Sequence, residues 1–212
     1  MEILAFAIGV VLYARLEVHF LKLFTWLLGI DALNETLIWL SSDVYHFRNL
    51  LYNVFSFLDM SFFFYLFYSI NDKGNARKII VGVFACLYVF SLVELFMKGW
   101  MVFHVNSLRC YNVSMILLCC YFFYLLFGKD YFEISTDPIF YLLFGVFIYQ
   151  SLLFVNFTTI SFSKYWKLAN ARKYFKMMQN INNVCYYSLI CVSFIISYYN
   201  RRRALARTSY PK

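Results

Sequence analysis

Residues 79–97 (IIVGVFACLYVFSLVELFM) decide the fold class of this chain. The run contains a single charged residue, Glu94, and it is bounded by Lys78 on one side and by Lys98 and Gly99 on the other. A helix needs roughly 20 residues, and at least about 17, to cross a bilayer core. The run therefore predicts a transmembrane helix that begins and ends at basic residues.

The composition of the whole chain agrees with this prediction. Of the 212 residues, 63% are hydrophobic and 14% are charged, and the mean hydropathy is +0.65. Soluble domains are closer to half apolar and a quarter charged. This much apolar surface needs lipid as its solvent, and no polar stretch is long enough to form a separate soluble domain.

Further apolar runs predict an all-α membrane protein, a bundle of about seven transmembrane helices with short loops. Residues 62–67 are apolar on every face, whereas the strands of a membrane barrel alternate between apolar and polar residues. We therefore expect one helical domain over residues 1–200 and a basic tail over residues 201–212. The predicted spans are residues 3–14, 20–40, 50–70, 79–97, 105–127, 139–160 and 184–199. A polar loop over residues 128–137 leads to Pro138, which suits the first turn of the sixth of these helices.

The distribution of Lys and Arg predicts the orientation. Short cytoplasmic segments carry an excess of these residues, and the strongest cluster is in the tail, at Arg201, Arg202, Arg203, Arg207 and Lys212. We therefore expect the N-terminus outside and the C-terminus inside. The first run lacks a basic segment before it and a cleavage site after it, which favours a retained span. The basic residues 164–176, on the outer side, have the spacing of an amphipathic interfacial helix.

Several function classes have no support in the sequence. The net charge of +8 comes from cations that flank apolar runs, so we expect no nucleic-acid partner. The six cysteines lie in apolar runs without a CxxC pair, and no histidine has metal-ligand spacing from them. No protease, phosphate-loop or other catalytic motif is present. We expect neither an enzyme nor a bound metal or cofactor.

Polar residues inside the predicted spans are the candidates for a ligand or ion pocket, because ionisable groups in a membrane are costly and are often functional. In the favoured orientation most of them fall in the outer half of the bilayer, with Asp31, Asp59 and Gln150 near the midplane. The candidates are Asp31, Asn34, Glu35, Asn53, Asp59, Glu94, Arg109, Asn112, Gln150 and Asn156.

Two interpretations of these residues stay open. They could surround one outward-facing cavity, closed on the inner side by the aromatic residues 62–67 and 121–127. They could instead only hold the helices together, as polar residues in membranes often do. In either case we expect Asp31 and Asp59 to face the interior of the bundle. We also expect Arg109 to pair with Glu94, or with Glu35 in its place.

Residues 51–159 resemble a family of small, largely uncharacterised polytopic membrane proteins that are common in Bacteroidota. The resemblance rests on residues 51–55 (LYNVF) with Asp59, on Phe103-His104 with residues 121–124 (YFFY), and on residues 137–140 (DPIF) with residues 145–149 (GVFIY). This chain departs from the family pattern at Tyr141, where Trp is usual, and at Asp59, where another acid is usual. Membership implies a bacterial inner-membrane location and an accessory role in signalling.

We therefore expect a multi-pass sensor or signalling accessory that passes an outer-face signal to a cytoplasmic partner or to a second copy of the chain. The alternative is a channel, pore or transporter-like protein, such as the membrane accessory or effector of a bacterial defence system. The sequence ranks this alternative second because it has no ring-forming charge motif and no inverted repeat.

The topology gives a first testable prediction. Alkaline phosphatase fused after Lys212 is expected to be inactive, because the basic cluster at Arg201–Arg203 keeps the tail in the cytoplasm. Green fluorescent protein at the same position serves as the control and is expected to fluoresce. An active phosphatase fusion would show that the C-terminus lies outside, which is the reverse of the predicted orientation.

Overall fold

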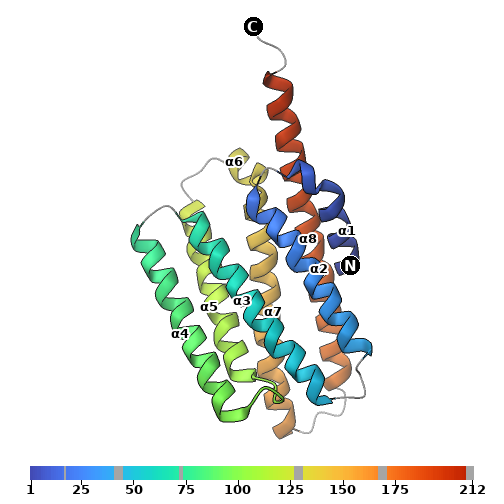
Figure 1. Cartoon of the computed structure of the whole chain (residues 1–212), viewed down its shortest axis with the longest axis vertical. Helices are drawn as coiled ribbons and strands as arrows, with labels where there is room; N and C mark the ends of the chain where they lie inside the picture. The colour runs from blue at the N-terminus through green and yellow to red at the C-terminus, as the bar shows by residue number, and fades with distance from the viewer. Residues whose placement is uncertain (17, 41–44, 72–73, 127–130, 167–170, 209–212) are drawn as a thin grey trace. The chain divides into compact units, whose positions relative to one another are not determined.

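The computed structural model describes residues 1–16, 18–40, 45–71, 74–126, 131–166 and 171–208 (Figure 1). Within these ranges every regular element is a helix, and no strand occurs. The elements are α1 (Glu2–Leu12), the 3₁₀ turn η1 (Tyr13–Arg15), α2 (His19–Leu40), α3 (Tyr45–Ile70), α4 (Gly74–Lys98), α5 (Val105–Leu126), α6 (Tyr131–Thr136), α7 (Pro138–Trp166) and α8 (Ala171–Thr208).

Six of the described helices are long and apolar enough to cross a membrane: α2, α3, α4, α5, α7 and α8. Between 28% and 44% of the most apolar part of each is buried within the chain, so most of its surface points outward. The outward residues include Trp39, Phe96 and Met97, which are 76% to 86% exposed. A surface of this kind is unusual for a protein in water and indicates a multi-pass protein embedded in a membrane.

The first predicted span is not among these six helices. Helix α1 has 11 residues, which at a rise of 1.5 Å per residue gives a length of about 16 Å. That is about half of a bilayer core. The predicted total of about seven spans therefore stays a prediction, and α1 is its short member.

The C-terminal part of the chain differs from the sequence interpretation. Helix α8 runs without interruption from Ala171 to Thr208, because residues 171–208 contain no Gly or Pro that would end it. The basic tail thus begins as helix, and residues 209–212 lie outside the described residues. The expected separate interfacial helix at 164–176 is divided between the end of α7 and the start of α8, with residues 167–170 outside the described ranges.

The expected polar loop before Pro138 contains a short helix, α6. Pro138 begins α7 as predicted. The side chain of Asp137 accepts a hydrogen bond of 2.9 Å from the backbone N–H of Ile139, and so caps one of the donors that the first turn of a helix leaves free.

The sequence predicts one helical domain over residues 1–200, and the helices group into two compact units. One unit contains residues 1–28 and 115–212, and the other contains residues 29–114. Helices α2 and α5 each contribute to both units. The two units are described separately below.

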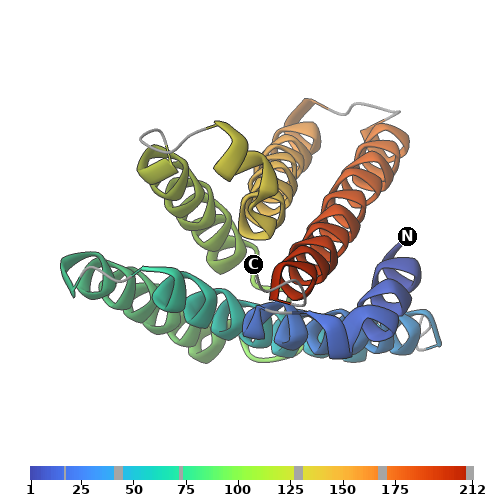
Figure 2. The ribbon, with the colours of Figure 1, turned by 90° about the horizontal axis from the view of Figure 1, so that it is seen from above.

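In the unit 1–28 and 115–212, α7 and α8 are antiparallel neighbours (Figures 1 and 2). Polar side chains of α8 bind backbone carbonyls along the pair. Asn182 donates to Tyr149 at 3.1 Å, Ser193 to Pro138 at 2.7 Å and Asn200 to Thr136 at 2.8 Å. The carbonyls at and just before the start of α7 thus obtain partners from α8.

Helix α1 packs against α8 in the same unit, and Gly9 permits the close approach. A Cβ atom built on Gly9 would lie 2.8 Å from the hydroxyl of Thr25 and 3.1 Å from the ring of Phe194. The Thr25 hydroxyl is fixed by its hydrogen bond to the Leu21 carbonyl, and Phe194 is fully buried. Neither side chain has space to move away.

In the unit 29–114, α3 packs against α4 (Figures 1 and 2). The Phe57 and Tyr88 rings stack with centroids 6.3 Å apart, and the rings of Phe64 and Phe84 meet edge to face at 5.2 Å. The Ser61 and Tyr88 hydroxyls are 2.5 Å apart. The Arg77 guanidinium of α4 also donates to the Tyr68 carbonyl of α3 at 3.3 Å. Aromatic and polar contacts therefore join these two helices.

Gly9→Ala is expected to destabilise the protein, because the added methyl group overlaps Thr25 and Phe194. Overpacking of this kind costs about 1–3 kcal/mol, which lowers the melting temperature of a chain of this size by about 2–10 °C. Thermal unfolding of the purified protein in detergent micelles measures the change. Gly82→Ala is the matched control, since a Cβ atom there meets nothing within 4 Å. An equal loss in both variants would contradict the close approach of α1.

Candidate functional site

The predicted site residues fall into both units. Gln150 and Asn156 belong to the unit that contains α7 and α8, and the remaining candidates belong to the unit 29–114. The geometry described here is therefore that within the unit 29–114, where α3, α4 and α5 supply most of the polar contacts. The members in this unit are Asp31, Asn34, Glu35, Asn53, Asp59, Glu94, Arg109 and Asn112.

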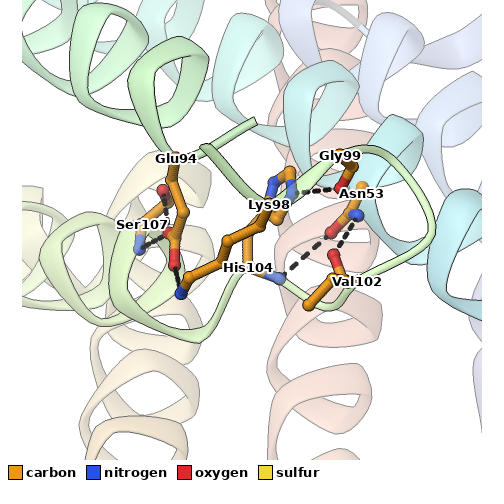
Figure 3. A network of polar contacts seen from close by, with 7 residues as sticks. All are labelled: Asn53, Glu94, Lys98, Gly99, Val102, His104 and Ser107. Carbon is orange, nitrogen blue, oxygen red and sulfur yellow. Dashed lines mark hydrogen bonds and ion pairs between the residues drawn. The ribbon is translucent and has the colours of Figure 1, made fainter. Parts of the chain in front are cut away.

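Asn53 on α3 holds the loop that joins α4 to α5 (Figure 3). Its amide nitrogen donates to the carbonyls of Trp100 and Val102 at 2.9 Å and 2.8 Å. Its amide oxygen accepts from the backbone N–H of His104 at 3.3 Å. Asn53 is 3% exposed, and all of its hydrogen bonds serve loop backbone that would otherwise lack partners.

The neighbours of Asn53 act in the same way. Asn49, one helical turn earlier, donates to the carbonyl of Met101 at 2.9 Å. The His104 ring nitrogen Nε2 lies 3.0 Å from the carbonyl oxygen of Gly99. Gly99 has a φ of 75°, a conformation that glycine adopts at little cost. It ends α4 by donating to Leu95 at 2.7 Å, in the manner of a glycine after a helix C-terminus.

Glu94 on α4 caps the start of α5 (Figure 3). Its Oε2 atom accepts from the Ser107 N–H at 2.7 Å and from the Ser107 hydroxyl at 2.5 Å. Ser107 is the third residue of α5, so its N–H has no acceptor within the helix. A carboxylate at this end is also favoured by the helix dipole.

The cation bound to Glu94 is Lys98, whose ammonium group forms an ion pair with Oε1. The two carboxylate oxygens of Glu94 thus bind Lys98 and Ser107, and the Arg109–Glu94 pair stays a prediction. The spacing of Glu94 and Lys98, four residues apart on one helix, is the sequence feature that points to the actual pair. The capping role of Ser107 has no comparable local pattern, because its partner lies on another helix.

A second polar group lies on α2, α3 and α5. The Tyr111 hydroxyl donates to the Asp59 carboxylate at 2.8 Å, so Asp59 has a polar neighbour within its own unit. Asp31 lies close enough to Asp59 for their charges to interact. The charges of Asp31, Glu35 and Arg48 act together on Tyr52. We call Asp31, Glu35 and Asp59 the acidic cluster.

The members of this group differ in exposure. Asp31 and Asp59 are partly buried and Glu35 is exposed, while Asn34 is 8% exposed. The cluster therefore extends from the interior of the unit to its surface. Two of its acids, Asp31 and Glu35, lie one turn apart on α2, as the sequence spacing indicates.

Asn112 is fully buried, yet neither of its amide atoms has a hydrogen-bond partner among the described residues. Leaving such a group without a partner costs about 1–3 kcal/mol. Gln150 is 3% exposed, and its amide oxygen is likewise without a partner within the described part of the chain. Asn156 is 7% exposed. The unbonded amide atoms of Asn112 and Gln150 are available to a bound molecule or to water.

The two predicted aromatic segments belong to different units. Within the unit 29–114, Phe64 packs on Phe84, as described above. In the other unit, Phe123 contacts the rings of Phe140, Phe144 and Phe147 at 5.8 Å to 6.3 Å. Each segment thus forms aromatic contacts inside its own unit, and Phe127 lies outside the described residues.

Within the described ranges, no group of three or more His, Cys, Asp or Glu side chains is arranged to hold a metal ion. No protein-family model matches the chain, and no curated protein or solved structure is significantly similar to it. The family resemblance stays a prediction.

A double-mutant cycle tests the cap of α5. Glu94→Ala and Ser107→Ala are each expected to destabilise the protein by about 1–2 kcal/mol, the usual effect of losing a cap. Because the two side chains are hydrogen-bonded to each other, the double variant is expected to lose less stability than the sum of the two single variants. The difference is at least about 0.5 kcal/mol. Thermal unfolding in detergent measures all four proteins. The control cycle replaces Ser107→Ala by Asn106→Ala, at an exposed neighbouring position. In this cycle the stability losses of Glu94→Ala and Asn106→Ala are expected to add. Additive losses in both cycles would rule out the cap.

Proposed function

We propose that this chain is a multi-pass sensor or signalling accessory of the bacterial inner membrane, with a ligand or ion site at the acidic cluster. The membrane location is supported by the six long apolar helices and by their large outward apolar residues. The short α1 is the seventh, incomplete member of the bundle. The tail after Arg201 is placed in the cytoplasm by its positive charge.

The observation that carries the proposal is the gathering of three carboxylates, Asp31, Glu35 and Asp59, on helices that are apolar enough to span a membrane. Each ionised carboxylate in a span costs at least about 2.5 kcal/mol. Part of this cost is offset inside the chain, by the Tyr111 hydroxyl on Asp59 and by the positive charge of Arg48 near Asp31 and Glu35. Like charges this close favour a bound cation or a ligand rich in hydrogen-bond donors.

The polar residues around Glu94 and Asn53 have a different role. Their hydrogen bonds all end on the chain itself, at the loop 99–104 and the start of α5. We therefore limit the proposed site to the acidic cluster and the unbonded amide of Asn112, and assign Asn53 and Glu94 to holding the helices in place. This division favours a small site within one unit over a wide cavity lined by all ten candidates.

The test uses the purified full chain in neutral detergent micelles, with Na⁺, K⁺, Mg²⁺, Ca²⁺ and spermidine as probes. At least one of these cations is expected to raise the melting temperature with saturation. A probe at about 100 times its Kd stabilises a protein by about 2.7 kcal/mol, or about 5–10 °C for a chain of this size. Asp31→Asn together with Asp59→Asn is expected to abolish the shift.

Glu133→Gln is the control, because Glu133 is an exposed acid on α6; this variant is expected to keep the full shift. A shift that survives in the Asp31/Asp59 variant, or is absent for every probe, would refute the site. Vesicles that contain the protein are expected to retain their ions, since a sensor provides no continuous path. Rapid ion release through the wild-type protein would favour the pore alternative.

A further inference from the structure

Cations and aromatic residues gather where α1 ends and the C-terminal end of α8 passes it. Arg201 donates to the carbonyl of Ala14 at 2.5 Å, which ties the two segments together. The Arg15 guanidinium donates to the Tyr198 hydroxyl at 3.3 Å and lies 5.6 Å from the centre of that ring. We call the cations Arg15, Lys22, Arg201, Arg202 and Arg203 the basic collar.

Aromatic residues with polar tips accompany the collar. The Trp26 indole N–H donates to the Tyr13 hydroxyl at 3.1 Å, and the Lys22 ammonium group lies 5.9 Å from the centre of the Tyr13 ring. Tyr and Trp concentrate at the level of lipid headgroups, where the ring is in an apolar setting and its polar atom is hydrated. Tyr13, Trp26 and Tyr198 therefore place the collar at a membrane surface.

The charge at this end of the unit is strongly positive. Arg202 and Arg203 are exposed, and they have no hydrogen bond or ion pair with any described residue. The described acids linked to this end are Glu133 and Asp137, since Asn200 binds the carbonyl of Thr136 between them. One oxygen of Asp137 is engaged in capping α7. Among the described residues, five cations therefore accompany two acids at this end.

An apolar stripe continues from these free cations along α8. Val192, Ile195 and Tyr199 are 37%, 41% and 51% exposed. With Arg202 they follow steps of three, four and three residues, so they lie on one face of the helix. The stripe is apolar for about 10 Å and then ends in guanidinium groups. An acyl chain fits the apolar part and an anionic headgroup fits the arginines.

We propose that the basic collar and the stripe on α8 bind anionic phospholipid, with the phosphate held by Arg202 and Arg203. Arginine is suited to this role because its planar group donates two parallel hydrogen bonds to a phosphate. A free anion or nucleic acid would use the arginines but not the stripe. The proposal goes beyond the sensing role. It depends on the membrane location and not on the acidic cluster, so either can fail without the other.

The experiment titrates the full chain in neutral detergent micelles with dioctanoyl phosphatidylglycerol, and separately with dioctanoyl phosphatidylcholine and inorganic phosphate. Apparent affinity comes from the rise in melting temperature with ligand concentration. Phosphatidylglycerol is expected to bind at least about fivefold more tightly than phosphatidylcholine, since each cation near an anionic surface contributes about that factor. Inorganic phosphate is expected to produce no comparable shift.

Paired variants locate the site. Arg202→Gln with Arg203→Gln is expected to weaken phosphatidylglycerol binding at least about fivefold. Arg202→Lys with Arg203→Lys is expected to weaken it less, because lysine keeps the charge but not the paired hydrogen bonds. Lys173→Gln with Lys176→Gln removes the same charge from exposed positions at the other end of α8 and is expected to leave binding unchanged. Equal losses in the two Gln variants, no loss in either, or an equal response to inorganic phosphate would each overturn the proposal.

Discussion

The structure depends on one constraint, which is that backbone N–H and C=O groups surrounded by apolar side chains must find partners within the chain. Long uninterrupted helices meet it for most residues. The places where helices end are then the difficult points, and polar side chains of other helices are directed there. Asn49 and Asn53 bind the carbonyls of the loop 99–104, and Ser193 and Asn200 bind carbonyls around the start of α7.

This constraint separates the polar residues of the spans into two kinds. Those of the first kind, such as Asn53 and Glu94, have hydrogen bonds that close entirely on the chain and therefore stabilise a helix end. Those of the second kind have hydrogen-bond donors or acceptors that find no partner among the described residues. The fully buried amide of Asn112 is the clearest case, because neither of its atoms has a hydrogen-bond partner among the described residues. Only the second kind supports a binding role.

The apolar outer surface and the charged helix ends are also related to each other, through the length of the helices. A helix as long as α8, with 38 residues, exceeds the thickness of a bilayer core, because about 20 residues suffice to cross it. The arginines lie on the part of α8 that exceeds this length, directly after the end of the apolar stripe. Cations, aromatic rings with polar tips and apolar residues therefore follow one another along the helix, in the order that the layers of a membrane surface would require.

The sequence by itself determined that the chain is helical and where most long helices lie. Apolar runs such as residues 79–97 need no distant partner to be recognised, because hydrophobicity and length are local properties. It also marked Pro138 as a helix start, since proline is restricted by its own ring. The polar residues were found as candidates because each one is costly in an apolar run.

Only the tertiary structure decided what those polar residues bind. Glu94 binds Lys98 and Ser107, and its contact with Ser107 depends on where the start of α5 lies relative to α4. Asn53 binds a loop some 50 residues later in the chain, at a distance that no local pattern encodes. The division of the candidates between two compact units is equally a property of packing. Hydrogen bonds are short and directional, so the identity of a partner is fixed only when the helices are in place.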